Sequence, residues 1–116
     1  MFEENELVRI RSIHKKLTDI TVIVARHGNA TTALQDVEGQ PAILMLLVAI
    51  AEQFNKLKKQ ESKLLDIFNE SDLRGIADTR TFIAHDYDGV NLSLIEVAIR
   101  NRIPVLLQTI DNVLAK

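Results

Sequence analysis

Apolar residues recur every three or four positions along most of the chain, which is the period of a helix with one buried face. The clearest stripe consists of Ile10, Ile13, Leu17, Ile20 and Val24. Gly28 and Asn29 follow it and tolerate the left-handed conformation that ends many helices. We therefore predict a first helix from Asn5 to Arg26, followed by a short polar loop.

The second predicted helix is apolar on nearly every side in its first half. Its body covers Ala42 to Leu57, and Pro41 suits a first turn. Three residues compete as its start, namely Thr32, Asp36 and Gly39. The bundle must cover this helix from several sides, with or without help from a second subunit. The apolar run Ala42–Ala51 has about half of the ~20 residues that cross a bilayer, so a buried helix is expected and no membrane contact.

Two further helices are predicted in the second half of the chain. Leu64 to Phe68 either finishes the central helix or forms a short one, and the polar segment from Asn69 offers a break with a cap. A third major helix should begin near Ser71 or Asp72. Its expected buried side carries Leu73, Ile76 and Ile83.

The last helix should follow a turn at Asp88-Gly89, with Asn91 as its cap. Its apolar stripe consists of Ile95, Ile99, Ile103, Leu106, Ile110 and Val113. Because this stripe continues past Pro104, the proline predicts a kink or a short restart and not the end of the bundle.

Length and composition agree with an all-α fold. The chain has 116 residues, of which 47% are hydrophobic, with only 4 Gly and 2 Pro to mark turns. Such a chain builds one modest core. We predict a single domain over residues 1–116, a four- to five-helix up-and-down bundle whose last helix is kinked near Pro104.

Charge and aromatic content limit the partners. The formal net charge is -2 and only 4% of residues are aromatic, so neither specific DNA binding nor an extended base-stacking surface is indicated, and any RNA contact must be local. A basic cluster follows the central helix and consists of Lys56, Lys58, Lys59 and Lys63. It is either a solvated helix end or an RNA contact.

The chain has no cysteine, and its acidic start from Phe2 to Glu6 is unlike a secretory signal. We therefore expect a cytoplasmic protein. No histidine shows metal-ligand spacing, so neither a metal site nor a cofactor is expected. His14 and His27 are interpreted as structural residues of the first helix and its end.

The segment from Arg80 to Tyr87 places a permanent cation, an imidazole and a phenol close together, and these groups suit phosphate chemistry. On an ideal helix Tyr87 returns to the face of Arg80, whereas His85 lies roughly 140° away. Either the helix loosens near Ala84, or two copies of the motif form one site across a symmetric dimer. The alternative is structural: His85 at a helix end, Tyr87 in the core, and Arg80 paired with an acidic neighbour, Asp86 or Glu96.

The pattern Arg80-x4-His85-x-Tyr87 resembles the R-x4-H-x-Y signature of the HepT-like toxins, which belong to the HEPN ribonuclease superfamily. Further segments resemble the long apolar helix and the closing helix of that family: Ala42–Glu52, Val90–Asn91 and Arg102–Pro104. The sequence departs from the family pattern in three ways. Thr81 stands where the family often has Asn, Asn91 stands where it often has Asp, and the usual Trp of the last helix is missing.

The resemblance implies a HEPN-like bundle that forms a homodimer and cleaves RNA, such as tRNA or mRNA, without a metal ion. In that reaction the ribose 2′-OH attacks the adjacent phosphate. His85 acts as general base or acid, and Arg80 holds the phosphate. Tyr87 contacts RNA or receives AMP from a minimal nucleotidyltransferase (MNT), the antitoxin partner. Thr81 and Asp86 are expected to support the site.

Two other functions stay open at the level of sequence. The chain can be a non-catalytic helical subunit that binds substrate for a nucleotidyltransferase, in which case His85→Ala has no effect on function. It can also be a helical dimer with a purely scaffolding role, in which case only unfolding substitutions abolish function.

Overall fold

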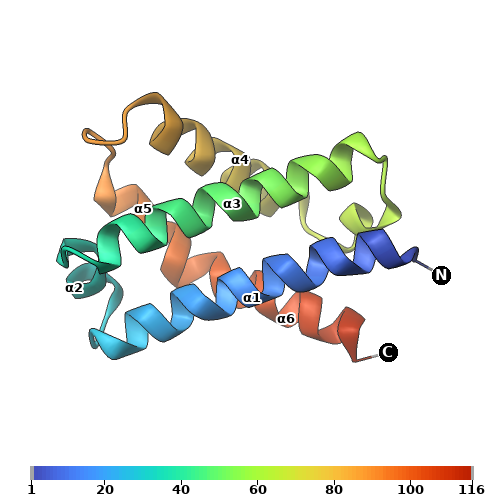
Figure 1. Cartoon of the computed structure of the whole chain (residues 1–116), viewed down its shortest axis with the longest axis horizontal. Coiled ribbons are helices and arrows are strands. Elements are labelled where there is room, and N and C mark those ends of the chain that lie inside the picture. Colours follow the sequence, from blue (N-terminus) through green and yellow to red (C-terminus); the bar gives the residue numbers. More distant parts are fainter. Residues whose placement is uncertain (1, 116) are drawn as a thin grey trace.

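The computed structural model describes residues 2–115, and all regular structure in that range is helical (Figure 1). The elements are α1 (Glu4–Arg26), α2 (Ala30–Gln35), α3 (Gly39–Lys59), the 3-10 helix η1 (Lys63–Ile67), α4 (Glu70–His85), α5 (Leu92–Asn101) and α6 (Ile103–Leu114). The predicted all-α class is confirmed. With α5 and α6 counted as one broken helix, the five α-helices also match the predicted number.

Helices α1 and α3 lie side by side and run in opposite directions (Figure 1). α4 then returns along α3, and the α5–α6 arm passes α2 and α1 on its way to the C-terminal end. The up-and-down order is the one predicted. One continuous hydrophobic cluster joins every helix, so the core extends along the whole bundle.

The predicted stripes face this core. Ile10, Ile13, Leu17 and Ile20 of α1 are all fully buried, and the predicted residues of the last arm from Ile95 to Ile110 are also buried. Leu73 of α4 and Val113 of α6 are only partly buried. The chain breaks between α5 and α6 at Arg102, so Pro104 enters the first turn of a restarted helix, as predicted.

The expected polar loop after Gly28-Asn29 is wrong, because that segment contains α2. The side chain of Asn29 accepts a hydrogen bond from the Thr32 N–H at 2.8 Å and so caps the helix. Burial of Ala30, Ala33 and Leu34 against the bundle then stabilises a helix too short to form alone.

Of the three candidate starts, Thr32, Asp36 and Gly39, α3 begins at Gly39. A Cβ atom at this position would lie 2.4 Å from the carbonyl oxygen of Ala33, so only glycine allows α2 and α3 to approach this closely. α4 begins at Glu70, slightly earlier than expected, because the side chain of Asn69 accepts from the Ser71 N–H. Within residues 2–115 no helix is long and apolar enough to cross a membrane.

Candidate functional site

The sequence-predicted motif occupies the last turns of α4. Ile76, Thr79 and Ile83 turn toward the bundle and are buried, whereas Arg80 and His85 are exposed. The helix remains α-helical through His85. The interpretation in which it loosens near Ala84 is therefore wrong, and the two side chains keep the angular separation of an ordinary helix.

α4 ends at His85 because Asp86 leaves the helical conformation. Its N–H still donates to the Phe82 carbonyl at 3.3 Å, but its backbone has φ -151 and ψ 82. Its carboxylate then accepts from the Gly89 N–H at 3.0 Å, which closes the turn predicted at Asp88-Gly89. A Cβ at Gly89 would lie 2.2 Å from the same carboxylate, so a larger residue there would have to displace the Asp86 side chain.

Tyr87 lies in this turn and not on the helix. The expectation that it returns to the face of Arg80 is wrong, since the helix ends before Tyr87 is reached. The side chain is 39% exposed, so the alternative in which its ring packs in the core is also wrong. The residue as a whole is therefore exposed at the surface.

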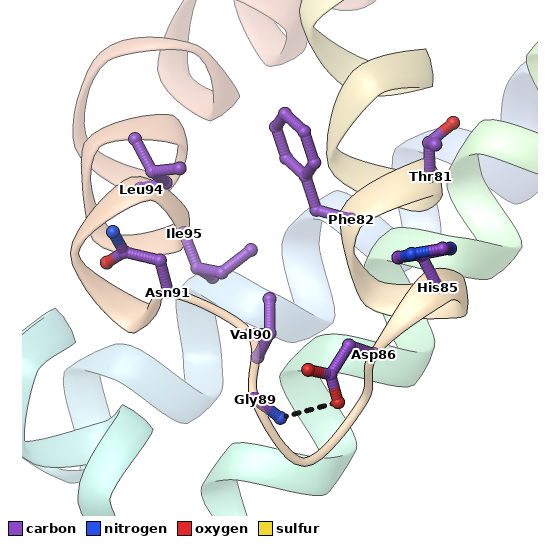
Figure 2. A pocket seen from close by; sticks show the side chains of 9 residues that line it. All are labelled: Thr81, Phe82, His85, Asp86, Gly89, Val90, Asn91, Leu94 and Ile95. Atoms are coloured by element: carbon purple, nitrogen blue, oxygen red, sulfur yellow. Dashed lines mark hydrogen bonds between the residues drawn. The ribbon is translucent and has the colours of Figure 1, made fainter.

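Two hollows flank the exposed face of α4. The larger is a pocket of about 470 Å³ between α4 and α5, and His85 and Thr81 line it (Figure 2). The smaller, of about 240 Å³, lies between α3 and α4, and its lining includes Arg80, Thr81 and Glu52. Within one chain, Arg80 and His85 therefore open into different hollows that meet at Thr81.

Arg80 forms no ion pair with any residue from 2 to 115. Glu96, one of its expected partners, instead pairs with Arg100 at 2.5 Å and accepts from the Thr31 hydroxyl at 2.6 Å. The structural alternative for Arg80 is therefore wrong. Its guanidinium is therefore available to bind an anion. The planar group can donate two parallel hydrogen bonds to the oxygens of a phosphate.

The other two histidines join helices, as expected for structural residues. The Nε2 atom of His14 lies 2.7 Å from Asp111, which links α1 to α6. The His27 ring donates to the Ile23 carbonyl through Nδ1 and lies 3.2 Å from Asp36 through Nε2. Hydrogen bonds from the backbone N–H groups of Gly39 and Glu38, with a smaller contribution from His27, lower the pKa of Asp36.

Metal ligands are not grouped in the part of the chain that the structure describes. Residues 2–115 contain no set of three His, Asp or Glu side chains close enough to hold an ion together.

Phe82 is a candidate site residue that the sequence pattern did not indicate. Its ring is 49% exposed in the larger pocket, and the available signal was its position three residues before His85, beside the buried stripe of α4.

The comparison with known families covers almost the whole bundle. The family described as ribonuclease HepT-like matches residues 10–113, a range that includes Arg80, His85 and Tyr87. No curated protein and no solved structure gives a significant match. The match extends from the first buried residue of α1 to the last turn of α6, and the chain therefore belongs to the HepT-like ribonuclease family.

Proposed function

We propose that this chain is the toxin subunit of a HepT/MNT pair and cleaves RNA in the cytoplasm without a metal ion. The observation that supports it is that Arg80 and His85 are both exposed on α4, and that Arg80 forms no ion pair with residues 2–115, in a chain of a ribonuclease family. A cation for the phosphate and an imidazole for proton transfer are the groups that this cleavage requires.

In the proposed reaction the ribose 2′-oxygen forms a bond to the adjacent phosphorus, and the bond from phosphorus to the 5′-oxygen breaks. His85 takes the proton of the 2′-OH as base, or donates a proton to the departing 5′-oxygen as acid. Arg80 binds the non-bridging oxygens and stabilises the charge that grows on them. Thr81 lines both hollows and is proposed to support the phosphate position, for which its hydroxyl must turn from the Ala77 carbonyl, to which it donates at 3.1 Å.

The complete site is proposed to form across a homodimer. One chain directs Arg80 and His85 into different hollows, and a two-fold contact along the exposed face of α4 would bring Arg80 beside His85 of the partner subunit. Such a contact also gathers positive charge that a chain of formal charge -2 does not otherwise offer to RNA.

Tyr87 is the proposed target of the nucleotidyltransferase antitoxin. Its exposed phenol is within reach of a modifying enzyme. AMP on this oxygen would add bulk and negative charge beside Asp86, and would repel the RNA phosphate from the site. Free Tyr87 contacts the RNA backbone.

The first experiment measures cleavage of total RNA and tRNA in EDTA by protein whose Tyr87 is shown by mass spectrometry to be unmodified. His85→Ala and Arg80→Ala are each expected to lose about 10²–10⁴-fold in rate, whereas His14→Ala, on α1, keeps its activity. Full activity of His85→Ala would contradict the nuclease mechanism. Equal inactivity of folded wild type and His85→Ala would instead favour the non-catalytic binding subunit.

A mixing experiment tests the composite site. Arg80→Ala and His85→Ala chains are inactive alone, but a mixed dimer contains one site with both intact residues if each site takes one residue from each subunit. About a quarter of wild-type activity should then return after subunit exchange. If each site lies within one chain, no activity returns.

A further inference from the structure

The pocket between α4 and α5 has the construction of a small-molecule site. Its volume of about 470 Å³ falls within the ~300–1,000 Å³ typical of ligand pockets. Apolar side chains from both sides and from the connecting loop line it, namely Phe82, Val90, Leu94 and Ile95. Polar groups at its edge can orient a ligand, as in most such pockets.

Phe82 presents an aromatic surface to this pocket. Figure 2 shows its ring on the α5 side of α4, across the gap from Leu94 and Ile95. The ring is 49% exposed and Leu94 is 52% exposed, so both retain apolar surface that a ligand can cover. A planar aromatic ligand would stack on the ring and contact the aliphatic side chains opposite.

Hydrogen-bonding groups stand at the edge of the pocket. One carboxylate oxygen of Asp86 accepts from the Gly89 N–H at 3.0 Å, and the other can accept from a ligand. The side-chain oxygen of Asn91 accepts from the Ser93 N–H at 3.0 Å, and Figure 2 shows this amide pointing away from Phe82. A ligand with a flat apolar face and a polar perimeter matches this set of groups.

The pocket adjoins the groups proposed to act on the phosphate. His85 lines it, and Thr81 belongs both to this pocket and to the hollow of Arg80. A phosphate held by Arg80 next to Thr81 would therefore leave the attached nucleoside free to enter the pocket. We infer that the α4–α5 pocket binds one RNA base next to the scissile phosphate, with Phe82 as its stacking partner; this inference rests on the proposed function.

A single base is the occupant that the surroundings favour. The chain has no second aromatic residue in this pocket, so it cannot stack a run of bases as single-strand binding surfaces do. The free carboxylate oxygen of Asp86 suits a heterocycle better than an aliphatic side chain of a second protein, which would leave this group without a partner. The pocket would thus restrict which nucleotide stands at the cleavage point.

A double-mutant cycle between Phe82 and the base tests the inference. The substrates are DNA oligonucleotides with one ribonucleotide, so that only one bond can be cleaved. Versions lacking the base at the ribonucleotide or at the following position are compared with the complete version. Removal of one of these bases is expected to lower kcat/KM by roughly 5- to 150-fold for the wild type.

Phe82→Ala should lose a similar factor on the complete substrate and nothing more on the version lacking that base, whereas Phe82→Trp should retain most activity. Val97→Ala is the matched control, because Val97 is a 54% exposed apolar residue of α5 that does not line the pocket. Equal losses for Phe82→Ala on both substrates would overturn the inference. If Phe82→Ala loses kcat/KM equally on both substrates and its dimer also dissociates in sedimentation, the pocket is a subunit contact and not a base site.

The double-mutant cycle can be repeated with the dissociation constant Kd in place of kcat/KM, which separates this inference from the nuclease function. An oligonucleotide with hydrogen in place of the scissile 2′-OH binds without being cleaved. If the wild type does not cleave but the cycle in Kd shows coupling between Phe82 and the base, the subsite stands and the nuclease function fails. Absence of coupling in Kd, or of any binding, overturns the subsite even if the wild type cleaves RNA.

Discussion

The α1–α3 pair and the last turns of α4 use the same secondary structure for opposite purposes. Along α1, each apolar side chain of the main stripe from Ile10 to Ile20 is fully buried, and α3 packs against α1 with a buried side from Ile43 to Leu57. Around Arg80 and His85, only Thr79 and Ile83 are buried. The free energy that holds the bundle is therefore concentrated away from the residues proposed to act on RNA.

The number of neighbours explains this difference. α3 contacts α1, α2, η1 and α4, and eight of its residues from Gly39 to Leu57 are buried, although Met45 stays 56% exposed. The end of α4 packs mainly on α3 and more lightly on α5, so only one face is covered. The uncovered face can carry a cation, an imidazole and a phenyl ring without a cost to the core.

The largest effect on stability is expected in the α1–α3 pair. Ile13→Ala removes a fully buried side chain from α1 and should lower the free energy of unfolding by about 2–5 kcal/mol. Urea unfolding followed by circular dichroism measures this. Val22→Ala, at a 48% exposed position of the same helix, should change it by less than about 0.5 kcal/mol. Similar losses of unfolding free energy for the two variants would show that burial in α1 does not set its contribution to stability.

An intermediate effect is expected at Arg102, which holds α4 against the break between α5 and α6. Its guanidinium donates to the Ser71 carbonyl at 2.9 Å and to Asp72 at 3.1 Å. It also occupies the space over Gly75, where a Cβ would lie 2.2 Å from its Cζ atom. Arg102→Ala should cost about 1–3 kcal/mol in unfolding free energy.

The matched control for Arg102 is Arg11, which forms an exposed pair with Glu4 at 3.4 Å. Arg11→Ala should cost about 0–1 kcal/mol, since exposed ion pairs contribute little. An equal cost for the two arginines would show that the contact with α4 adds nothing beyond a surface ion pair.

A change in pH dependence is expected at Asp36, between α2 and α3. The backbone N–H groups of Gly39 and Glu38 hold the pKa of this carboxyl below its ordinary value of 3.8. The folded pKa is thus lower than the unfolded one, so the stabilisation is present above about pH 3.8 and is lost as the pH falls through the folded pKa. Between about pH 5 and pH 3, Tm should fall less steeply for Asp36→Asn than for the wild type. Identical slopes would rule out this contribution.

The smallest effect on stability is expected on the exposed face of α4. Arg80→Ala and His85→Ala should each change the free energy of unfolding by less than about 0.5 kcal/mol, because neither side chain is buried and no ion pair of Arg80 is lost. Urea unfolding of the two purified variants measures this. A loss as large as that of Ile13→Ala would mean that the motif is structural, and would remove the separation between stability and chemistry.

Much of the fold could be predicted from local pattern. The stripe of α1 and the run in α3 are long enough for the helical period to be recognised, and Asn91 caps the helix that it was expected to cap. The polar segment from Asn69 was expected to offer a cap, and Asn69 itself provides it. α2 escaped prediction because Ala30, Ala33 and Leu34 are too few to show a period. Its stability comes from contact with α1, α3 and α5, which no local window contains.

The candidate site was predicted in part. Its location on the third major helix and the angular separation of Arg80 from His85 follow from the helical repeat. The end of the helix before Tyr87 depends on the carboxylate of Asp86 binding the Gly89 N–H. The importance of Phe82 depends on α5, because only Leu94 and Ile95 opposite its ring turn an exposed side chain into the wall of a pocket.

The sequence by itself determined the long helices and which face of each is buried, because backbone hydrogen bonding imposes a short period that apolar residues must follow. Only the tertiary structure decided that Arg80 lines the hollow between α3 and α4 and His85 the pocket between α4 and α5, with Thr81 shared by the two. The physical reason is that a hollow is formed by side chains of helices distant in sequence, and its shape depends on how those helices pack.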